Sequence, residues 1–227
     1  MIFRQSFDPP SSTLTYLLAD DLGTAVIIDP VLEQVGHYLG LLDQLGLRLA
    51  WALDTHIHAD HITGADALRR STGATTVIAA SCGAEGYDRQ LVDGEVLAFG
   101  GESLRVIATP GHTPGSLCYL WRDRLFTGDT LMINACGRTD FQRGSSVKMY
   151  RSITQKLFIL PDETLVYPGH DYKGRRVSSI GEEKVLNLRI AGKTEQEFCD
   201  IMDNLNLATP QRMHEAVPAN LLGGRLD

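Results

Sequence analysis

The sequence predicts a layered α/β protein in which helices cover the faces of β-sheets. Short β-like runs bounded by glycine or proline recur along the chain, and segments with helical spacing of apolar residues lie between them. Of the 227 residues, 43% are hydrophobic and 22% are charged, close to the average for soluble globular proteins. Strands with helices on both sides build layers around a common core, so one large domain, or one with a modest appendage, is expected.

The first elements follow from residue types and spacing. Thr13–Leu18 and Ala25–Ile28 are predicted strands, and Asp29-Pro30 ends the second one. A helix is expected next, because the apolar residues Val31, Val35, Leu39, Leu42 and Leu45 recur at spacings of three and four. Gly36 and Gly40 lower the helix propensity of this segment.

The remaining elements rest on the same signals, and no repeat or low-complexity linker interrupts them. Predicted strands cover Leu47–Leu53, Thr75–Ala79, Val96–Phe99, Leu104–Ala108, Leu117–Trp121, Arg124–Phe126 and Thr164–Tyr167. Predicted helices cover Ala65–Arg70, Val147–Leu157 and Glu195–Leu205.

Composition excludes several classes of function. A formal net charge of −7 without a basic run argues against nucleic acid or an anionic membrane as the main partner. Apolar runs such as Leu157–Leu160 fall far short of the ~20 residues that cross a bilayer. The four cysteines show no CxxC spacing and are expected to be free thiols. Because the start lacks the features of a secretory or transit peptide, the chain is expected in the cytoplasm, or as a mature processed form.

Seven potential metal ligands lie in four short motifs. THIHADH contains His56, His58, Asp60 and His61. Each of the other three motifs contributes one side chain: His112 in TPGHTPGS, Asp129 in FTGDT and His170 in YPGHDY. Each motif follows a β-like run, so these loops are expected to meet at one sheet edge, where rigid strands hold side chains in place.

These residue types point to zinc or non-haem iron. Neutral imidazole nitrogen and carboxylate oxygen suit both metals, whereas calcium prefers oxygen ligands and iron–sulfur clusters need thiolates. His56 and His58, two apart on an extended segment, project to the same side and can approach one metal. Asp60 and His61 could serve a second metal, so the residues alone leave one or two metals open.

The spacing HxHxDH, together with the later motifs, resembles the metallo-β-lactamase superfamily. The resemblance implies a four-layer αβ/βα sandwich, with two mixed β-sheets face to face, helices outside and a metal site at one edge. Hydrolases and oxidoreductases both occur in this superfamily, so the fold alone does not decide the function.

Four segments resemble the persulfide (sulfur) dioxygenase family more closely: Ile133–Gly144 (INACGRTDFQRG), Tyr167–Lys173, Asp203–Leu207 (DNLNL) and Ala216–Asn220 (AVPAN). This resemblance implies oxidation of glutathione persulfide by dioxygen and water to sulfite and glutathione, in sulfide catabolism. The cofactor implied is one mononuclear non-haem Fe(II) per chain.

The resemblance also implies roles for individual residues. The iron ligands would be His56, His112 and Asp129, a facial arrangement that leaves about three positions open. Groups that orient ligands and solvent would be His58, Asp60, His61 and His170. The glutathione part would contact Arg138, Tyr172, Thr113 and Cys136, with the planar Arg138 guanidinium as a carboxylate clamp.

The expected organisation is a single metallo-β-lactamase-like domain over residues 1–227, with a short C-terminal helical tail at about 180–227. No appended rhodanese domain is expected, so a sulfur transferase partner would be a separate protein. The protein could form a homodimer, and a processed form could be located in the mitochondrial matrix.

Two alternatives remain. A dinuclear zinc hydroxyacylglutathione hydrolase of the glyoxalase II type would use the same ligands, with Asp129 bridging two metals and a metal-activated hydroxide. Against it stand the CGRTDFQ segment and the short chain after His170, because that family usually continues into a long helical tail. The other alternative is a non-catalytic metal-bound module that senses or stores persulfide.

Overall fold

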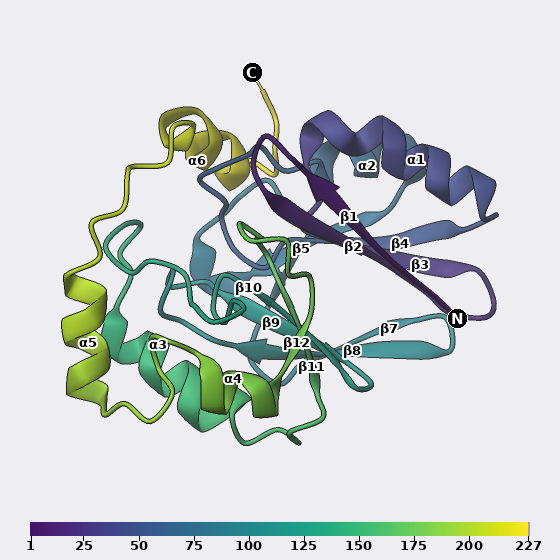
Figure 1. Ribbon diagram of the computed structural model, residues 1–227. Helices are drawn as coiled ribbons and strands as arrows, with labels where there is room; N and C mark the ends of the chain where they lie inside the picture. The colour runs from purple at the N-terminus through teal and green to yellow at the C-terminus, as the bar shows by residue number, and fades with distance from the viewer. Residues whose placement is uncertain (227) are drawn as a thin grey trace.

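The computed structural model describes residues 1–226 and contains two six-stranded sheets packed face to face (Figure 1). The first sheet has the order β1 (Ile2–Asp8), β2 (Thr13–Ala19), β3 (Thr24–Ile28), β4 (Arg48–Leu53), β5 (Thr75–Ala79) and β6 (Arg89–Leu91). The second has the order β12 (Ser178–Ser179), β11 (Leu165–Pro168), β10 (Arg124–Gly128), β9 (Leu117–Trp121), β8 (Glu102–Ala108) and β7 (Val96–Phe99).

Both sheets are mixed, and their parallel pairs position the functional loops. In the first sheet β3, β4, β5 and β6 run parallel, after the antiparallel strands β1 and β2. In the second sheet the single parallel pair is β10 with β11. Parallel neighbours end at the same sheet edge, so the loops after β3, β4, β10 and β11 emerge close together.

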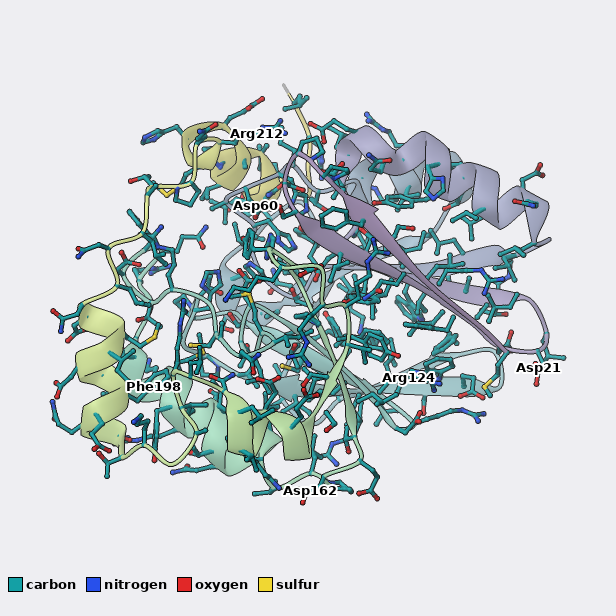
Figure 2. The ribbon with its side chains drawn as sticks, viewed as in Figure 1. Asp21, Asp60, Arg124, Asp162, Phe198 and Arg212 are labelled. Atoms are coloured by element: carbon teal, nitrogen blue, oxygen red, sulfur yellow. The ribbon has the colours of Figure 1, made fainter. Side chains whose placement is uncertain are left out.

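Helices cover the outer face of each sheet (Figure 1). The first sheet is covered by α1 (Val35–Gln44) and α2 (Ala65–Thr72). The second is covered by α3 (Ser146–Ser152), α4 (Ile180–Leu186) and α5 (Glu195–Asp203), whereas α6 (Met213–Leu221) lies beside the first sheet. Figure 2 shows Phe198 projecting from α5 toward α3, where its ring lies 5.7 Å from that of Tyr150. Apolar side chains thus fill both outer layers as well as the space between the sheets.

An aromatic cluster joins the two sheets. The ring of Tyr16 on β2 lies 4.9 Å from that of Phe126 on β10, which lies 5.6 Å from that of Tyr167 on β11. The buried Tyr16 hydroxyl donates to the carbonyl oxygen of Pro168, 2.5 Å away. Because Pro168 stands two residues before His170, the core fixes the start of a ligand-bearing loop.

Most predicted elements are confirmed, and the differences have physical causes. The predicted helix at 147–157 divides into α3 and a π-helical turn over Ile153–Leu157. Strand β1 was not predicted, although Pro9 and Pro10 mark the turn to its partner β2, because Arg4, Gln5 and Ser6 interrupt its apolar pattern. Pro218 inside α6 argues against a helix in sequence, yet α6 forms there. Within residues 1–226, no helix is long and apolar enough to cross a membrane.

Candidate metal centre

The loops after the strands meet at one edge of the sandwich. Asp129 follows β10, His170 follows β11, and the loop between β4 and α2 carries His56. Close approach of these loops needs a glycine before Asp129. Gly128 has a φ of +48°, and a Cβ atom there would lie 2.4 Å from the Thr55 hydroxyl oxygen.

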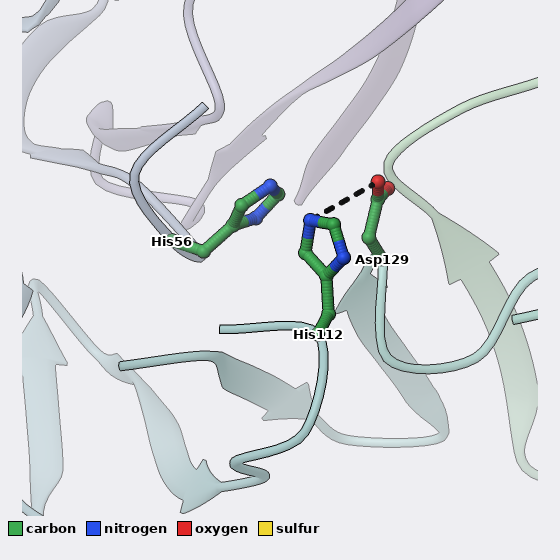
Figure 3. A group of neighbouring side chains, drawn as sticks. All are labelled: His56, His112 and Asp129. Carbon is green, nitrogen blue, oxygen red and sulfur yellow. Dashed lines mark ion pairs between the residues drawn. The ribbon is translucent and has the colours of Figure 1, made fainter. Parts of the chain in front are cut away.

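His56, His112 and Asp129 come together at this edge (Figure 3). One candidate ligand atom from each side chain lies within 4.8 Å of the other two. Asp129 Oδ2 is 3.7 Å from His112 Nε2, the contact drawn as a dashed line. The two imidazole rings are 4.8 Å apart and almost perpendicular, at 84°. Both sheets therefore contribute to one group of three side chains.

Hydrogen bonds select the ring nitrogen that His56 offers. The Thr55 hydroxyl donates its single proton to Asp29 Oδ2 at 2.9 Å, while the Thr55 backbone N–H donates to Asp29 Oδ1 at 2.7 Å. The Thr55 oxygen must then accept from His56 Nδ1, which is 3.0 Å away. This tautomer leaves a lone pair on His56 Nε2.

His112 is oriented in the same way by a carbonyl group. Its Nδ1 lies 2.7 Å from the backbone oxygen of Arg138, and a carbonyl oxygen can only accept. Gly137 permits this approach, because a Cβ atom there would lie 2.9 Å from His112 Nδ1. The lone pair of His112 is consequently on Nε2, facing Asp129.

The three side chains fit a divalent cation. Burial, together with the neighbouring His58 and His112, holds the pKa of His56 well below its usual range, so His56 is neutral. Burial opposes ionisation of Asp129, but the nearby histidines outweigh it, with His170 first, and lower its pKa. Two lone pairs and a carboxylate therefore face one point without a proton donor between them. Two imidazoles and one carboxylate form the set typical of non-haem iron and also bind zinc.

His170 supports Asp129 by joining two carboxylates. Its Nδ1 is 2.7 Å from Asp129 Oδ1, and its Nε2 is 3.0 Å from Asp60 Oδ2. Burial disfavours the charged ring, but both carboxylates outweigh it and raise the pKa of His170 well above its usual range. His170 therefore donates from both nitrogens and leaves Asp129 Oδ2 directed at the metal position. His61 Nδ1 also contacts Asp60, at 2.9 Å.

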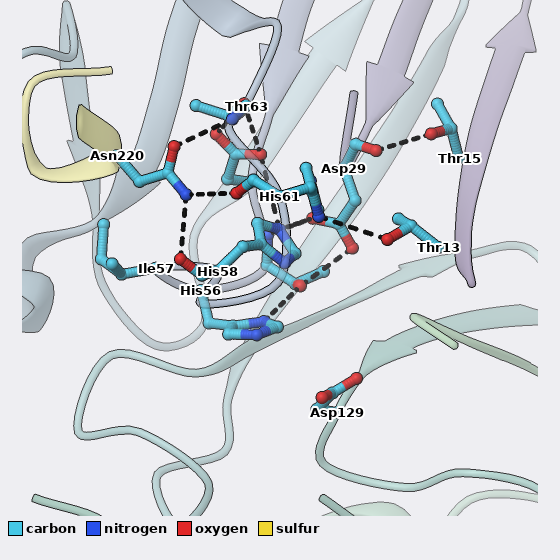
Figure 4. Close-up of polar contacts among 12 residues, drawn as sticks. Thr13, Thr15, Asp29, His56, Ile57, His58, His61, Thr63, Asp129 and Asn220 are labelled. Atoms are coloured by element: carbon cyan, nitrogen blue, oxygen red, sulfur yellow. Dashed lines mark hydrogen bonds and ion pairs between the residues drawn. The ribbon is translucent and has the colours of Figure 1, made fainter. Parts of the chain in front are cut away.

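His58 points toward a buried acidic pair. Its Nε2 is 3.1 Å from Asp29 Oδ1 and 3.7 Å from Asp54 Oδ1 (Figure 4). Burial disfavours its charged form, yet the carboxylates of Asp29 and Asp54 raise the pKa of His58 to about 10. The opposite ring nitrogen, Nδ1, is buried and has no hydrogen-bond partner among the described residues. The charged His58 ring thus offsets part of the negative charge of two carboxylates that support the loop.

A cavity of about 500 Å³ opens beside the three side chains. Its lining includes His56, Asp60, His112, Asp129, Cys136, Arg138, His170, Tyr172, Lys173, Arg189, Leu207, Ala208 and Pro210. Three cationic side chains, Arg138, Lys173 and Arg189, thus face one cavity in a protein of net negative charge. Arg189 was not predicted to be a site residue, because it lies outside every motif in the sequence.

The Arg138 guanidinium is already engaged. Its Nε and Nη2 donate to the two carboxylate oxygens of Asp140 at 2.7 and 2.8 Å, and its Nη1 donates to the Ala208 carbonyl at 2.6 Å. Its plane also lies over the ring of Phe141, 4.2 Å from the centroid. An incoming carboxylate would have to displace Asp140 to be clamped in bidentate fashion.

The other three residues predicted to contact glutathione lie in different surroundings. Tyr172 is 68% exposed at the cavity mouth, and its ring is parallel to that of His170, 5.7 Å away. Cys136 is fully buried in the cavity wall, where burial raises its thiol pKa to about 11 despite the nearby Arg189. Thr113 lines a separate cavity of about 180 Å³ and bonds Ser116. The structure therefore brings Tyr172 and Cys136 to the large cavity, but not Thr113.

Comparison with known proteins gives the same fold along the whole chain. A family model described as the metallo-beta-lactamase superfamily matches residues 8–170. A human protein named "Persulfide dioxygenase ETHE1, mitochondrial" is 47% identical over 99% of this chain and 89% of its own. A crystal structure of ETHE1 from Myxococcus xanthus matches with a TM-score of 0.97 and 53% identity, covering 99% of this chain and 100% of that one. A metallo-beta-lactamase from Staphylococcus aureus subsp. aureus COL matches with a TM-score of 0.88 and 28% identity, over 97% of this chain and 71% of that one. The predicted sandwich of two mixed sheets flanked by helices is confirmed.

Proposed function

The chain belongs to the metallo-β-lactamase superfamily, and we propose that within this superfamily it is a persulfide dioxygenase. The observation that carries the proposal is the full-length likeness to relatives that bear this name. The reaction proposed is the oxidation of glutathione persulfide by dioxygen and water to sulfite and glutathione.

A single ferrous ion held by His56, His112 and Asp129 is the proposed cofactor. His170 already joins Asp60 to Asp129 and is therefore not free to bind a metal. The proposal of one iron rests on the likeness to the persulfide dioxygenases. Ferrous iron at such a site would offer about three open coordination positions, while the outer sulfur of the persulfide would supply the electrons that reduce dioxygen as it is oxidised to sulfite.

The chain's own residues bind the substrate and fix the ligands. We propose that the glutathione carboxylates, which are anionic, pair with the cations that line the cavity, Arg138, Lys173 and Arg189. Tyr172 lines the same cavity, which supports the proposal that its hydroxyl donates a hydrogen bond to the substrate. Cys136, as a buried neutral thiol, shapes the wall and does not act as a nucleophile.

The rival function is a dinuclear zinc thioesterase. One observation keeps it testable: His58, Asp60 and His61 form a second group whose candidate ligand atoms lie within 4.8 Å of one another. His58 Nδ1 and His61 Nε2 have no hydrogen-bond partner among the described residues, so a second metal would have to compete only for Asp60, which contacts His170 and His61.

Metal analysis coupled to oxygen uptake distinguishes these functions. Protein purified without oxygen is expected to contain one iron per chain and to consume oxygen only after glutathione persulfide is added. Glutathione alone is the control for the persulfide sulfur, and a glutathione thioester is the control for hydrolysis. Two zinc ions per chain with thioester hydrolysis and no oxygen uptake would overturn the proposal.

Several expectations about partners and location remain proposals. Light scattering tests the homodimer, and sulfur transfer from a separately added transferase tests that partner. The single domain with a C-terminal tail at about 180–227 is tested by limited proteolysis. The human relative is named as mitochondrial. Cell fractionation decides between a matrix form and the cytoplasm for this chain.

A further inference from the structure

The loop that carries four ligand-type side chains has no regular structure to hold it. Residues 54–62 form neither helix nor strand between β4 and α2. His58 and His61 are nevertheless buried, at 1% and 0% exposure. Their backbone carbonyls need hydrogen-bond donors in a place that water does not reach. The groups that supply those donors determine how firmly the loop keeps its shape.

Asn220 of α6 supplies them (Figure 4). Its Nδ2 donates to the carbonyl oxygens of His58 and His61, both at 2.9 Å, and its Oδ1 accepts from the Thr63 N–H at 2.8 Å. Asn220 is 1% exposed, so solvent cannot take over these bonds. A carboxamide combines an acceptor with two donor hydrogens, whereas an ionised aspartate offers acceptors only. The three bonds therefore require an asparagine at this position.

Close backbone packing holds Asn220 in place. The Leu221 carbonyl oxygen accepts from the backbone N–H of Gly86 at 3.2 Å. A Cβ atom on Gly86 would lie only 1.9 Å from the carbonyl carbon of Leu222, so the two segments are in direct backbone contact. Helix α6 consequently presents the carboxamide from a fixed position.

The same C-terminal segment also contacts the support of the second histidine. The Arg138 guanidinium donates to the carbonyl oxygens of Leu207 and Ala208, at 3.2 and 2.6 Å. The Arg138 carbonyl accepts from His112. Residues 207–220 thus reach His112 through Arg138 and the His56 loop through Asn220.

We propose that Asn220 is a positioning residue of the metal centre, and that through its carboxamide helix α6 braces the loop that carries His56. The inference rests on the proposed metal centre, although Asn220 contacts neither metal nor substrate. Without its bonds, the 54–62 loop gains freedom, and His56 Nε2 leaves its place opposite His112 and Asp129 more often. A metal held by only three protein ligands is sensitive to such a displacement.

The test compares Asn220→Asp with a distant control. Asn220→Asp keeps the shape of the side chain but turns the two donors into an oxygen that faces two carbonyls. We expect it to weaken Co²⁺ binding, measured by chelator competition, by about 10- to 100-fold, the usual cost of losing a ligand support. Co²⁺ is the probe because its visible absorption bands also report the coordination geometry, and these bands should shift.

Asp20→Ala is the matched control. Asp20 is 4% exposed and accepts from the backbone N–H groups of Leu22, Thr24 and Gly101, beyond the opposite end of β2. Its loss should lower the melting temperature while leaving Co²⁺ affinity and absorption unchanged. If Asn220→Asp does not fold, Asn220→Ser replaces it, with an intermediate loss expected because the hydroxyl keeps part of the bonding.

Two results would count against the inference. If the Asn220 variants and the Asp20 variant lose similar amounts of melting temperature and bind Co²⁺ equally well, Asn220 has only a structural role. In that case the proposal that it positions the His56 loop is wrong. Absence of Co²⁺ binding by the unchanged protein would overturn the metal centre itself, so the two failures are distinguishable.

Discussion

The two sheets contribute to the site in different ways. The loop from the first sheet is mostly buried and is hydrogen-bonded to several other segments: His56 is 2% exposed, and its neighbours engage Asp29, Asp54 and Asn220. The loops from the second sheet face the cavity, where the side chains of His112 and Asp129 are each 13% exposed. One side of the site is fixed by the fold, and the other is open to ligands.

This difference predicts that variants on the two sides fail in different ways. Changes on the buried side should cost stability, because they leave buried polar groups without partners. Changes on the open side should cost metal or substrate binding while the fold persists.

Asp129→Ala, on the open side, should have the largest effect on function. It removes one of three proposed ligands, so metal affinity should fall by more than about 100-fold, the upper cost of losing only a ligand support. Oxygen uptake with glutathione persulfide should disappear. Bound metal and turnover are the measurements, and Asp162→Ala, at an exposed surface position, is the control. A normal metal content in Asp129→Ala would remove this residue from the ligand set.

His58→Leu, on the buried side, should have the largest effect on stability. It leaves Asp29 and Asp54 buried without their shared cation, a loss typically worth about 3–5 kcal/mol. His112→Leu, by comparison, removes one hydrogen bond to a carbonyl, worth about 1 kcal/mol. Urea unfolding of the metal-free proteins measures both. Equal losses of unfolding free energy in His58→Leu and His112→Leu would contradict the distinction between the buried side and the open side of the site.

The His58 contribution should depend on pH. Its pKa is about 10 in the folded protein against 6.5 for the unperturbed group. The folded state therefore binds this proton more tightly, and the stabilisation is complete below pH 6.5 and is lost as pH rises toward 10. Urea unfolding across this range should show a decline that His58→Leu lacks. If the free energy of unfolding fell equally with pH in the unchanged protein and in His58→Leu, the pH dependence would arise from groups other than His58.

Arg138→Ala should have a smaller effect, confined to substrate use. Losing a charged hydrogen bond costs about 1.5 kcal/mol or more, so KM should rise by about tenfold. Metal content should stay near one per chain, because the Arg138 backbone carbonyl that holds His112 remains. Arg138→Lys keeps the positive charge but cannot form the two parallel hydrogen bonds of a guanidinium. Its KM should therefore lie between those of the unchanged protein and Arg138→Ala. Metal loss in Arg138→Ala would show that the side chain supports the metal and not the substrate.

Sequence reasoning predicts the fold well where patterns are local. The predicted strands at 25–28, 75–79 and 117–121 correspond to β3, β5 and β9, because short apolar runs with turn residues at their ends are typical of strands. The ligand-type residues could be found because histidines that recur in several loops after strands are typical of a metal site. His56, His112 and Asp129 do lie together, and their role as ligands stays a prediction.

The supports of the site could not be predicted in the same way. Asp29 reads as the end of a strand, and Asn220 reads only as part of AVPAN, since the atoms they bind are backbone groups distant in sequence. Arg189 carries no motif at all. Such residues depend on tertiary contacts, which leave no periodic signal along the chain.

The placement of the three proposed ligands also bears on how long the protein survives. His56 belongs to one sheet, whereas His112 and Asp129 belong to the other, so a bound metal is a removable cross-link between the halves of the sandwich. A ligand that binds only the folded state raises its free energy of unfolding in proportion to the logarithm of ligand concentration. A cell short of metal would thus hold fewer copies of this protein, because proteases clear molecules that open more often.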